Sequence, residues 1–204
     1  MSLLSARVSH HVLKVTLLPR GSSLVLFDGE GHEVEALLVG ILDGQARVQA
    51  TADIQRVLAL GRTELVMGLP RKPVWERVLR MGTELGVSVF RPFVARRSVA
   101  KGEHLQRWER LVESAAQQCG RADVPAVRGL EAVGSMDLPA LRLAMVPGAP
   151  RLDRPKEDVA LLVGPEGGLH PDELVDWQEA GLGPTTLRAD TAAVAALALY
   201  RPIP

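Results

Sequence analysis

The pattern of hydrophobic and polar residues divides the chain into a first part typical of β-strands and a second part in which strands alternate with helices. Apolar residues alternate with polar ones over 34–38 and 46–50, and glycine-containing turns at 28–31 and 43–44 bound these stretches. A period of two with Asp-Gly turns predicts antiparallel hairpins, and short strands of this kind favour a small barrel. We therefore expect a β domain over residues 1–68.

Beyond residue 69 the hydrophobic period lengthens to that of helices. Apolar residues recur at spacings of three and four between Val74 and Leu85, which predicts a helix, and 87–90 follows as a short strand. A second helix is expected over about 104–119, with Gly120 as its C-cap and Cys119 on its buried face as an inert thiol.

The last third of the chain continues the alternation. The apolar runs 141–146 and 159–163 are typical of parallel strands that are covered on both faces. Pro171, followed by two acidic residues, predicts the start of a helix. Residues 191–199 form an apolar helix that must be buried all round or packed on another subunit. The pattern predicts an α/β domain with a parallel sheet over 69–204.

Composition excludes several classes of protein. The chain of 204 residues is 47% hydrophobic, so it can bury a core, and its single cysteine excludes a disulfide framework and a cysteine-rich zinc site. No apolar run is long enough for a membrane helix, and the N-terminus lacks the apolar stretch of a signal peptide. Histidine and acidic residues show no metal-ligand spacing. We expect a soluble cytoplasmic protein without a metal.

A net charge of zero hides an asymmetry along the chain. Residues 1–128 carry 18 basic and 13 acidic side chains, whereas residues 129–204 carry 6 and 11. Arginine supplies 20 of the 24 basic residues, which favours bidentate contacts with phosphate or carboxylate. An Arg-rich genome with an ordinary solvated surface explains the same composition, so charge alone does not decide between a nucleic-acid partner and none.

The strongest local signal is LVGPEGGL at 162–169, where a buried strand runs into a loop with three glycines. Ligands bind at the carboxyl ends of strands in open α/β sheets, and glycine lets the backbone approach them. The loop lacks the Lys-Ser/Thr of a phosphate-binding loop, and Glu166 would repel an anion. A neutral or cationic small molecule fits better, although a purely structural glycine turn remains the alternative.

A second loop, GPTTLRADTA at 183–192, precedes the apolar C-terminal helix. Arg188 lies there between two apolar stretches, where an unpaired guanidinium would be unfavourable. It either pairs with an acid such as Glu166 or Asp190, or it faces a ligand site.

Together, these two loops resemble the paired signatures of the RsmE family of ribosomal RNA methyltransferases. Three further segments are similar to that family and lie in its order: TELGV at 83–87, RRSV at 96–99 and AAQQCGR at 115–121. The resemblance covers nearly the whole chain. It implies methylation of N3 of a uridine in 16S ribosomal RNA of the small subunit, with S-adenosylmethionine (AdoMet) as cofactor.

The resemblance also implies a fold. The C-terminal domain, 69–204, would be a SPOUT methyltransferase domain with a deep trefoil knot, and 1–68 would be a PUA-like β-barrel that binds RNA. The family acts as a homodimer. AdoMet would lie among three loops, and the resemblance implies contacts from Met145, Leu162, Val163, Gly164, Gly168, Leu182, Gly183, Leu187, Thr191 and Ala192, with Thr191 capping the last helix.

Roles in the reaction follow from the same resemblance. Arg188 is the candidate for stabilising negative charge on a uracil oxygen, because a guanidinium keeps its proton and offers a fork of donors. Glu166 would take the N3 proton or orient Arg188, and orientation is the interpretation we favour. Phosphate contacts are expected from basic residues near the loops, namely Lys14, Arg20, Arg96, Arg97, Lys101 and Arg121.

Several positions depart from the family pattern. An Arg that is common in the family is absent near Leu17, and Ser22 replaces a common Asp. Further departures lie at Met81, Gln117 and Thr185. Two other functions therefore stay open. One is another SPOUT enzyme that methylates a ribose 2′-oxygen or a transfer RNA base, and the other is a non-catalytic ribosome-assembly factor.

Overall fold

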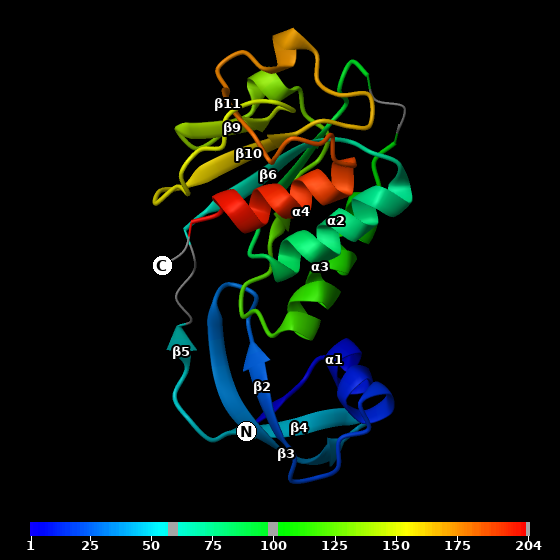
Figure 1. The fold of residues 1–204 in the computed structure, drawn as a ribbon. Helices are drawn as coiled ribbons and strands as arrows, with labels where there is room; N and C mark the ends of the chain where they lie inside the picture. Colours follow the sequence, from blue (N-terminus) through cyan, green and yellow to red (C-terminus); the bar gives the residue numbers. More distant parts are fainter. Residues whose placement is uncertain (57–60, 98–101, 203–204) are drawn as a thin grey trace. The chain divides into compact units, whose positions relative to one another are not determined.

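The structure is a computed structural model that describes residues 1–56, 61–97 and 102–202, and the chain divides into two compact units, Met1–Leu58 and Ala59–Pro204 (Figure 1). The division falls ten residues before the boundary expected at 68. The reason is that the strand β6 (Thr63–Gly68) lies in the middle of the second unit's sheet, between β10 and β7.

The N-terminal unit is built on an antiparallel sheet with the strand order β1-β4-β3-β2, and β5 pairs with β3. Asp43 and Gly44, with φ of 50° and 79°, make the tight turn between β3 and β4. A small cluster that includes Val12, Leu38 and Val48 forms its core. Its strands are β1 (Ser2–Leu3), β2 (Ser23–Phe27), β3 (His32–Leu42), β4 (Gln45–Ala50) and β5 (Gln55–Arg56).

Residues 6–15 are helical, although the first part of the chain was expected to consist of strands. The helix α1 (Ala6–His10) continues into one π-helical turn, η1 (His11–Val15), and Val8 and Val12 share the face that packs on the core. The Ser9 hydroxyl, also on this side, donates to the Leu4 carbonyl at 3.1 Å and accepts from the Ala46 N–H at 2.9 Å. These contacts tie the helix to β4.

The second unit is an α/β fold with a parallel sheet of strand order β11-β9-β10-β6-β7-β8, as the alternation of strands and helices predicts. The apolar run 159–163 is confirmed as β10, in the interior of the sheet. The remaining strands are β7 (Val89–Phe93), β8 (Ala126–Val127), β9 (Leu141–Met145) and β11 (Gln178–Ala180).

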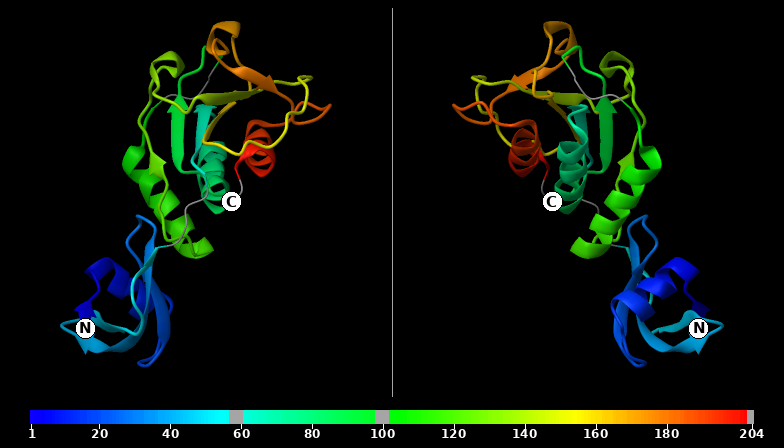
Figure 2. Two further views of the ribbon diagram at one scale, coloured as in Figure 1. Left: turned by 90° about the vertical axis from the view of Figure 1, so that its left-hand side faces the viewer. Right: turned by 90° about the vertical axis from the view of Figure 1, so that its right-hand side faces the viewer.

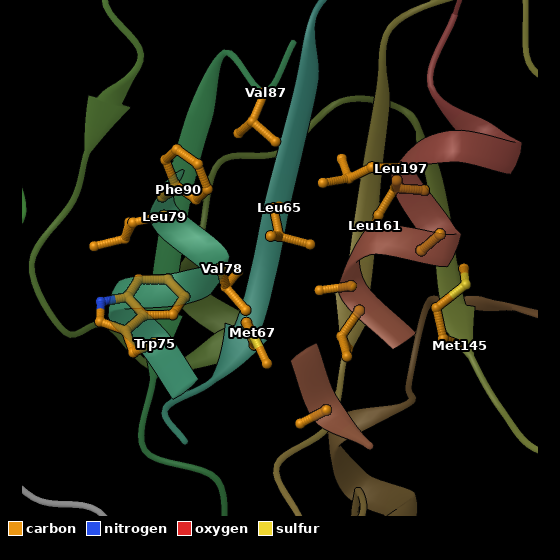
Figure 3. Packing of buried hydrophobic residues seen from close by; sticks show 14 of the residues in the cluster. Leu65, Met67, Trp75, Val78, Leu79, Val87, Phe90, Met145, Leu161 and Leu197 are labelled. Carbon is orange, nitrogen blue, oxygen red and sulfur yellow. The ribbon is translucent and has the colours of Figure 1, made fainter. Parts of the chain in front are cut away.

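Three helices pack together on one face of this sheet, and α2 contacts both α3 and α4 (Figures 1 and 2). They are α2 (Lys72–Glu84), α3 (Leu105–Cys119) and α4 (Ala189–Tyr200). The ring of Trp75 meets Phe90 and Trp108 edge to face, at centroid distances of 6.2 and 5.8 Å. Figure 3 shows how α2, α4 and the strands share one core, with side chains that include Leu65, Met67, Trp75, Leu161 and Leu197.

The opposite face of the sheet is covered by irregular segments. A second apolar cluster there contains Val66, Phe93 and Leu162, and partly buried side chains such as Leu174 and Trp177 pack on it. The helix expected after Pro171 is a single 3₁₀ turn, Pro171–Glu173.

One expectation about a helix is corrected, and one of the two alternatives for another helix is excluded. Cys119 is exposed rather than buried, because α3 ends there and Gly120 adopts a left-handed φ of 76° that turns the chain away. The apolar helix α4 is not buried all round within one chain: Ala193 and Leu197 are buried, whereas Thr191 and Ala198 are exposed. Within the described residues, no helix is long and apolar enough to cross a membrane.

Candidate active site

A pocket of about 520 Å³ lies where β9 and β10 end, in the second unit. Three segments line it: the residues that follow β9, the glycine loop that follows β10, and the chain from Leu182 into the first turn of α4. These are the three loops expected from the sequence. Most of the wall is apolar or backbone, which suits a mixed aromatic and polar small molecule.

The structure brings together eight of the ten residues expected to contact a cofactor. The pocket is lined by Met145, Val163, Gly164, Gly168, Leu182, Gly183, Leu187 and Ala192.

The other two residues do not face the pocket. Leu162 is fully buried in the second apolar cluster, because alternate residues of β10 point to opposite faces of the sheet. Thr191 is exposed, and its N–H donates to Asp190 Oδ1 at 3.0 Å. The N-cap of α4 is Arg188 rather than Thr191.

The glycine loop leaves its backbone open toward the pocket. A tight turn closes with the Gly168 N–H donating to the Pro165 carbonyl at 2.9 Å, and Gly168 has a left-handed φ of 76°. A Cβ built on Gly164 would lie 3.0 Å from Leu169 Cγ, so the loop folds back closely on itself. Backbone groups can therefore approach a ligand without side chains between them.

The wall formed by 181–188 is held from behind by close backbone contacts. The Gly181 N–H donates to the Pro150 carbonyl at 2.8 Å, and a Cβ on Gly181 would lie only 2.0 Å from the Ala149 carbonyl oxygen. The hydroxyl of the fully buried Tyr200 donates to the Gly181 carbonyl at 2.7 Å and accepts from the Leu152 N–H at 3.3 Å. Tyr200 could not be recognised from the sequence, where its only signal is a single tyrosine at the end of an apolar helix.

Arg188 and Glu166 both line the pocket, and both are exposed. From the sequence, Arg188 was expected either to pair with an acid or to face a ligand site. Among the ion pairs of the described residues, neither Arg188 nor Glu166 takes part, and Asp190 pairs with Arg77 at 3.2 Å instead. The structure thus places the guanidinium at the pocket and leaves it available to a ligand. No group of side chains suited to a metal ion occurs among the described residues.

The basic residues expected to contact RNA differ in their surroundings. Lys14 and Arg20 are exposed on the N-terminal unit. Arg96 and Arg97 are exposed in the loop after β7, where Arg96 pairs with Asp172 at 2.7 Å and Arg97 Nη1 donates to the Gly167 carbonyl at 3.4 Å. Lys101 lies outside the described residues.

Arg121 is a structural residue, contrary to the expectation that it contacts RNA. Its guanidinium donates to both carboxylate oxygens of Asp123 and, through Nη1, to the carbonyls of Thr83 and Val87 at 2.8 and 2.9 Å. Burial by itself raises the pKa of Asp123, but the hydrogen bonds and charge of Arg121 outweigh it and hold that pKa below its usual value. The residue therefore ties the end of α3 to the turn between α2 and β7.

We expect Arg121→Met to lower the free energy of unfolding by about 2 kcal/mol, because two carbonyls and a carboxylate lose their donors. Urea unfolding followed by circular dichroism measures the change. Arg110→Met, at an exposed arginine of α3, is the matched control and should change stability little. Equal stability of the two variants would return Arg121 to the candidates for RNA contact.

Comparison with known proteins adds evidence for the family. Residues 58–201 match a family model described as an RNA methyltransferase domain. The ribosomal RNA small subunit methyltransferase E of Mycobacterium bovis is 32% identical over 212 residues, covering 92% of this chain and 80% of the relative. The protein of the same name from Synechocystis is 30% identical over 209 residues, covering 93% and 69%.

Solved structures agree with these relatives. A ribosomal RNA small subunit methyltransferase E from Neisseria gonorrhoeae, bound to S-adenosyl methionine, has a TM-score of 0.85 at 27% identity, covering 97% of this chain and 89% of that one. A putative methyltransferase from Legionella pneumophila with the same cofactor has a TM-score of 0.82, at the same identity and coverage. The SpoU methyltransferase AviRb from Streptomyces viridochromogenes, at 15% identity and a TM-score of 0.51 over 75% of this chain and 66% of that one, shares the fold.

Proposed function

Because the chain belongs to the ribosomal RNA small subunit methyltransferase E family, we propose that it methylates N3 of a uridine in 16S ribosomal RNA with AdoMet as the methyl donor. The observation that carries this proposal is the pocket of about 520 Å³, into which eight of the ten expected cofactor contacts converge. Its open glycine backbone and apolar walls fit a nucleoside cofactor with a cationic sulfonium better than an anion.

The chain's own residues have separate tasks in this proposal. The backbones of the glycine loop and of residues 182–187 hold the adenine and the ribose, while Met145 and Ala192 exclude water from the pocket. AdoMet, when bound, supplies a methyl group that is already activated by its positive sulfur. The protein must then bring uracil N3 into line and stabilise the negative charge that develops on the base.

Arg188 and Glu166 complete the proposed chemistry. The guanidinium of Arg188 donates to a uracil oxygen as the N3 proton leaves, and its fork can reach the base in two places. Glu166 was expected mainly to orient Arg188. Since the two side chains form no ion pair among the described residues, we assign Glu166 the other role, in which its carboxylate accepts the N3 proton.

The finer architecture belongs to the same proposal. We assign the N-terminal unit as a PUA-like RNA-binding domain and the second unit as a SPOUT domain with a trefoil knot. We also propose a cytoplasmic homodimer in which the exposed Ala198 of α4 and the partly exposed Val194 and Ala195 are covered by a second copy. Sedimentation at micromolar concentration that shows only a ~22 kDa monomer would exclude the dimer.

The experiment that tests the function is transfer of tritium from labelled AdoMet to small ribosomal subunits that lack the modification, followed by nucleoside identification. We expect 3-methyluridine. A 2′-O-methylated nucleoside would assign the chain to another SPOUT activity. AdoMet binding without any transfer would favour the non-catalytic assembly factor.

We expect Arg96→Ala combined with Arg97→Ala to weaken RNA binding and to reduce its salt dependence. Two lost phosphate contacts should lower the slope of log K against log salt by about 1–2, because fewer counterions are released. Filter binding at several salt concentrations measures the slope. Arg110→Ala with Arg128→Ala removes the same charge from exposed positions elsewhere in the unit and serves as the control. Equal slopes for both double variants would remove Arg96 and Arg97 from the RNA surface.

A further inference from the structure

Glu173 is a buried carboxylate whose two oxygens accept hydrogen bonds from two different loops. Its Oε1 accepts from the Arg96 N–H at 2.8 Å, and its Oε2 accepts from the His170 N–H at 2.7 Å. Arg96 lies in the loop after β7, and His170 lies just beyond the glycine loop that follows β10. One side chain thus joins loops that leave two different strands of the sheet. Hydrogen bonds from N–H groups to a carboxylate are short and strong.

Further contacts close the same seam, which we define as the contact between residues 95–97 and residues 167–173. The Arg96 guanidinium pairs with Asp172 at 2.7 Å, and Arg97 Nη1 donates to the Gly167 carbonyl at 3.4 Å. A Cβ built on Gly167 would lie 2.8 Å from the Arg97 carbonyl oxygen. The two backbones are therefore in direct contact, and neither loop can shift without displacing the other.

The two loops of the seam adjoin different binding sites. On one side, Arg96 and Arg97 are exposed and carry the phosphate contacts proposed above. On the other side, Gly168, Leu169 and Leu174 line the pocket on either side of Glu173 in the sequence. Neither Glu173 nor Gly167 lines the pocket itself. The seam is thus a physical connection between the surface for RNA and the wall of the cofactor pocket.

We propose that Glu173 is a positioning residue that couples RNA binding to cofactor binding, an inference that rests on the proposed function. A carboxylate is required because two N–H donors need two acceptor oxygens. Glutamine keeps the shape but offers one acceptor, and its NH₂ group would face the second N–H. Since coupling between two binding sites is reciprocal, RNA that fixes the 95–97 loop must strengthen cofactor binding by the same factor as cofactor strengthens RNA binding.

The test measures this factor directly. The dissociation constant of small ribosomal subunits lacking the methyl group is determined with and without saturating S-adenosylhomocysteine, which cannot react. For the wild-type protein we expect the subunits to bind at least about fivefold more tightly with the cofactor analogue, the lower end of typical couplings. For Glu173→Gln we expect a ratio below about twofold. A merely structural role would change both affinities but leave their ratio intact.

Asp172→Asn is the matched control, because it removes the same charge from the neighbouring residue and breaks the ion pair with Arg96 but leaves the Glu173 hydrogen bonds in place. Its side chain is exposed, so we expect the wild-type ratio. If Glu173→Gln does not fold, Gly167→Ala opens the seam from the other side and should lower the ratio in the same way.

Three results would overturn the inference: a wild-type ratio near one, a wild-type ratio in Glu173→Gln, or an equal loss in Asp172→Asn. Each of these results differs from what failure of the proposed function would give. If the proposed function were wrong, the wild-type protein would not transfer the methyl group to the subunits or would not bind the cofactor analogue at all.

Discussion

Arg188→Lys is expected to reduce turnover by roughly 10²–10³, the loss typical of removing one donor that stabilises a developing anion. Lysine keeps the positive charge but loses the planar fork of donors. It can therefore neutralise the negative charge that develops on the uracil, but it cannot donate two hydrogen bonds to the base in the geometry of a guanidinium. Affinities for AdoMet and for RNA should change by less than about tenfold, because the contact matters mainly in the transition state. Single-turnover methylation, together with calorimetry for AdoMet, separates these quantities.

Arg201→Lys is the control for this experiment, since Arg201 lies at the other end of α4 and does not line the pocket. It should retain wild-type turnover. If Arg188→Lys also stays within threefold of wild type, Arg188 has no part in the chemistry. If AdoMet affinity collapses together with turnover, Arg188 is a cofactor-binding residue.

Gly181→Ala should lower AdoMet affinity by more than about 100-fold. The added Cβ would lie 2.0 Å from the Ala149 carbonyl oxygen, and the backbone fixes the position of both atoms, so neither can rotate out of the way. The two segments must separate, so the pocket wall at Leu182 and Gly183 moves. Calorimetry with AdoMet measures the loss. Gly134→Ala, at an exposed glycine with open space around it, should bind as wild type does.

A milder variant tests the same wall if Gly181→Ala does not fold. Tyr200→Phe removes only the hydroxyl that joins Gly181 to Leu152, and we expect AdoMet affinity to fall about threefold to tenfold. Unchanged affinity in a Gly181→Ala protein with native circular dichroism would show that AdoMet does not bind in this pocket.

The sequence predicted the elements whose hydrophobic pattern is regular. VALLV at 159–163 is apolar throughout and is β10, while the spacing of apolar residues predicted α2 and α3. The sequence did not reveal that β6 belongs to the sheet of the second unit, because Glu64 interrupts its apolar run. That carboxylate is fully buried and pairs with Arg91 of the neighbouring strand at 2.5 Å and with Arg62. A charge that is paired only in the folded sheet cannot be recognised in the sequence as a core residue, so the domain boundary was placed too late.

The candidate site divides in the same way. Residues in the two glycine-containing loops could be named from the sequence, because each loop carries its own signature. Tyr200 and Glu173 could not, since their partners, Gly181 and Arg96, become neighbours only through the topology of the sheet. Arg121 was expected to contact RNA because it is a basic residue near a loop, and nothing in the sequence indicates that carbonyls of the distant Thr83 and Val87 are its acceptors.

The order of the strands has a consequence for how the protein is made. All the residues that line the pocket lie between Met145 and Ala192. The strand β10, which completes the centre of the sheet, pairs with the much earlier strand β6, and just before it Asp158 accepts a hydrogen bond from the Arg62 N–H, 96 residues earlier in the chain. Chains fold from the N-terminus as they emerge, so β6 waits with one edge unpaired while the rest is translated. A nascent chain has no site for the cofactor until α4 has left the ribosome. The cofactor site is therefore among the last features that the second unit acquires as it is made.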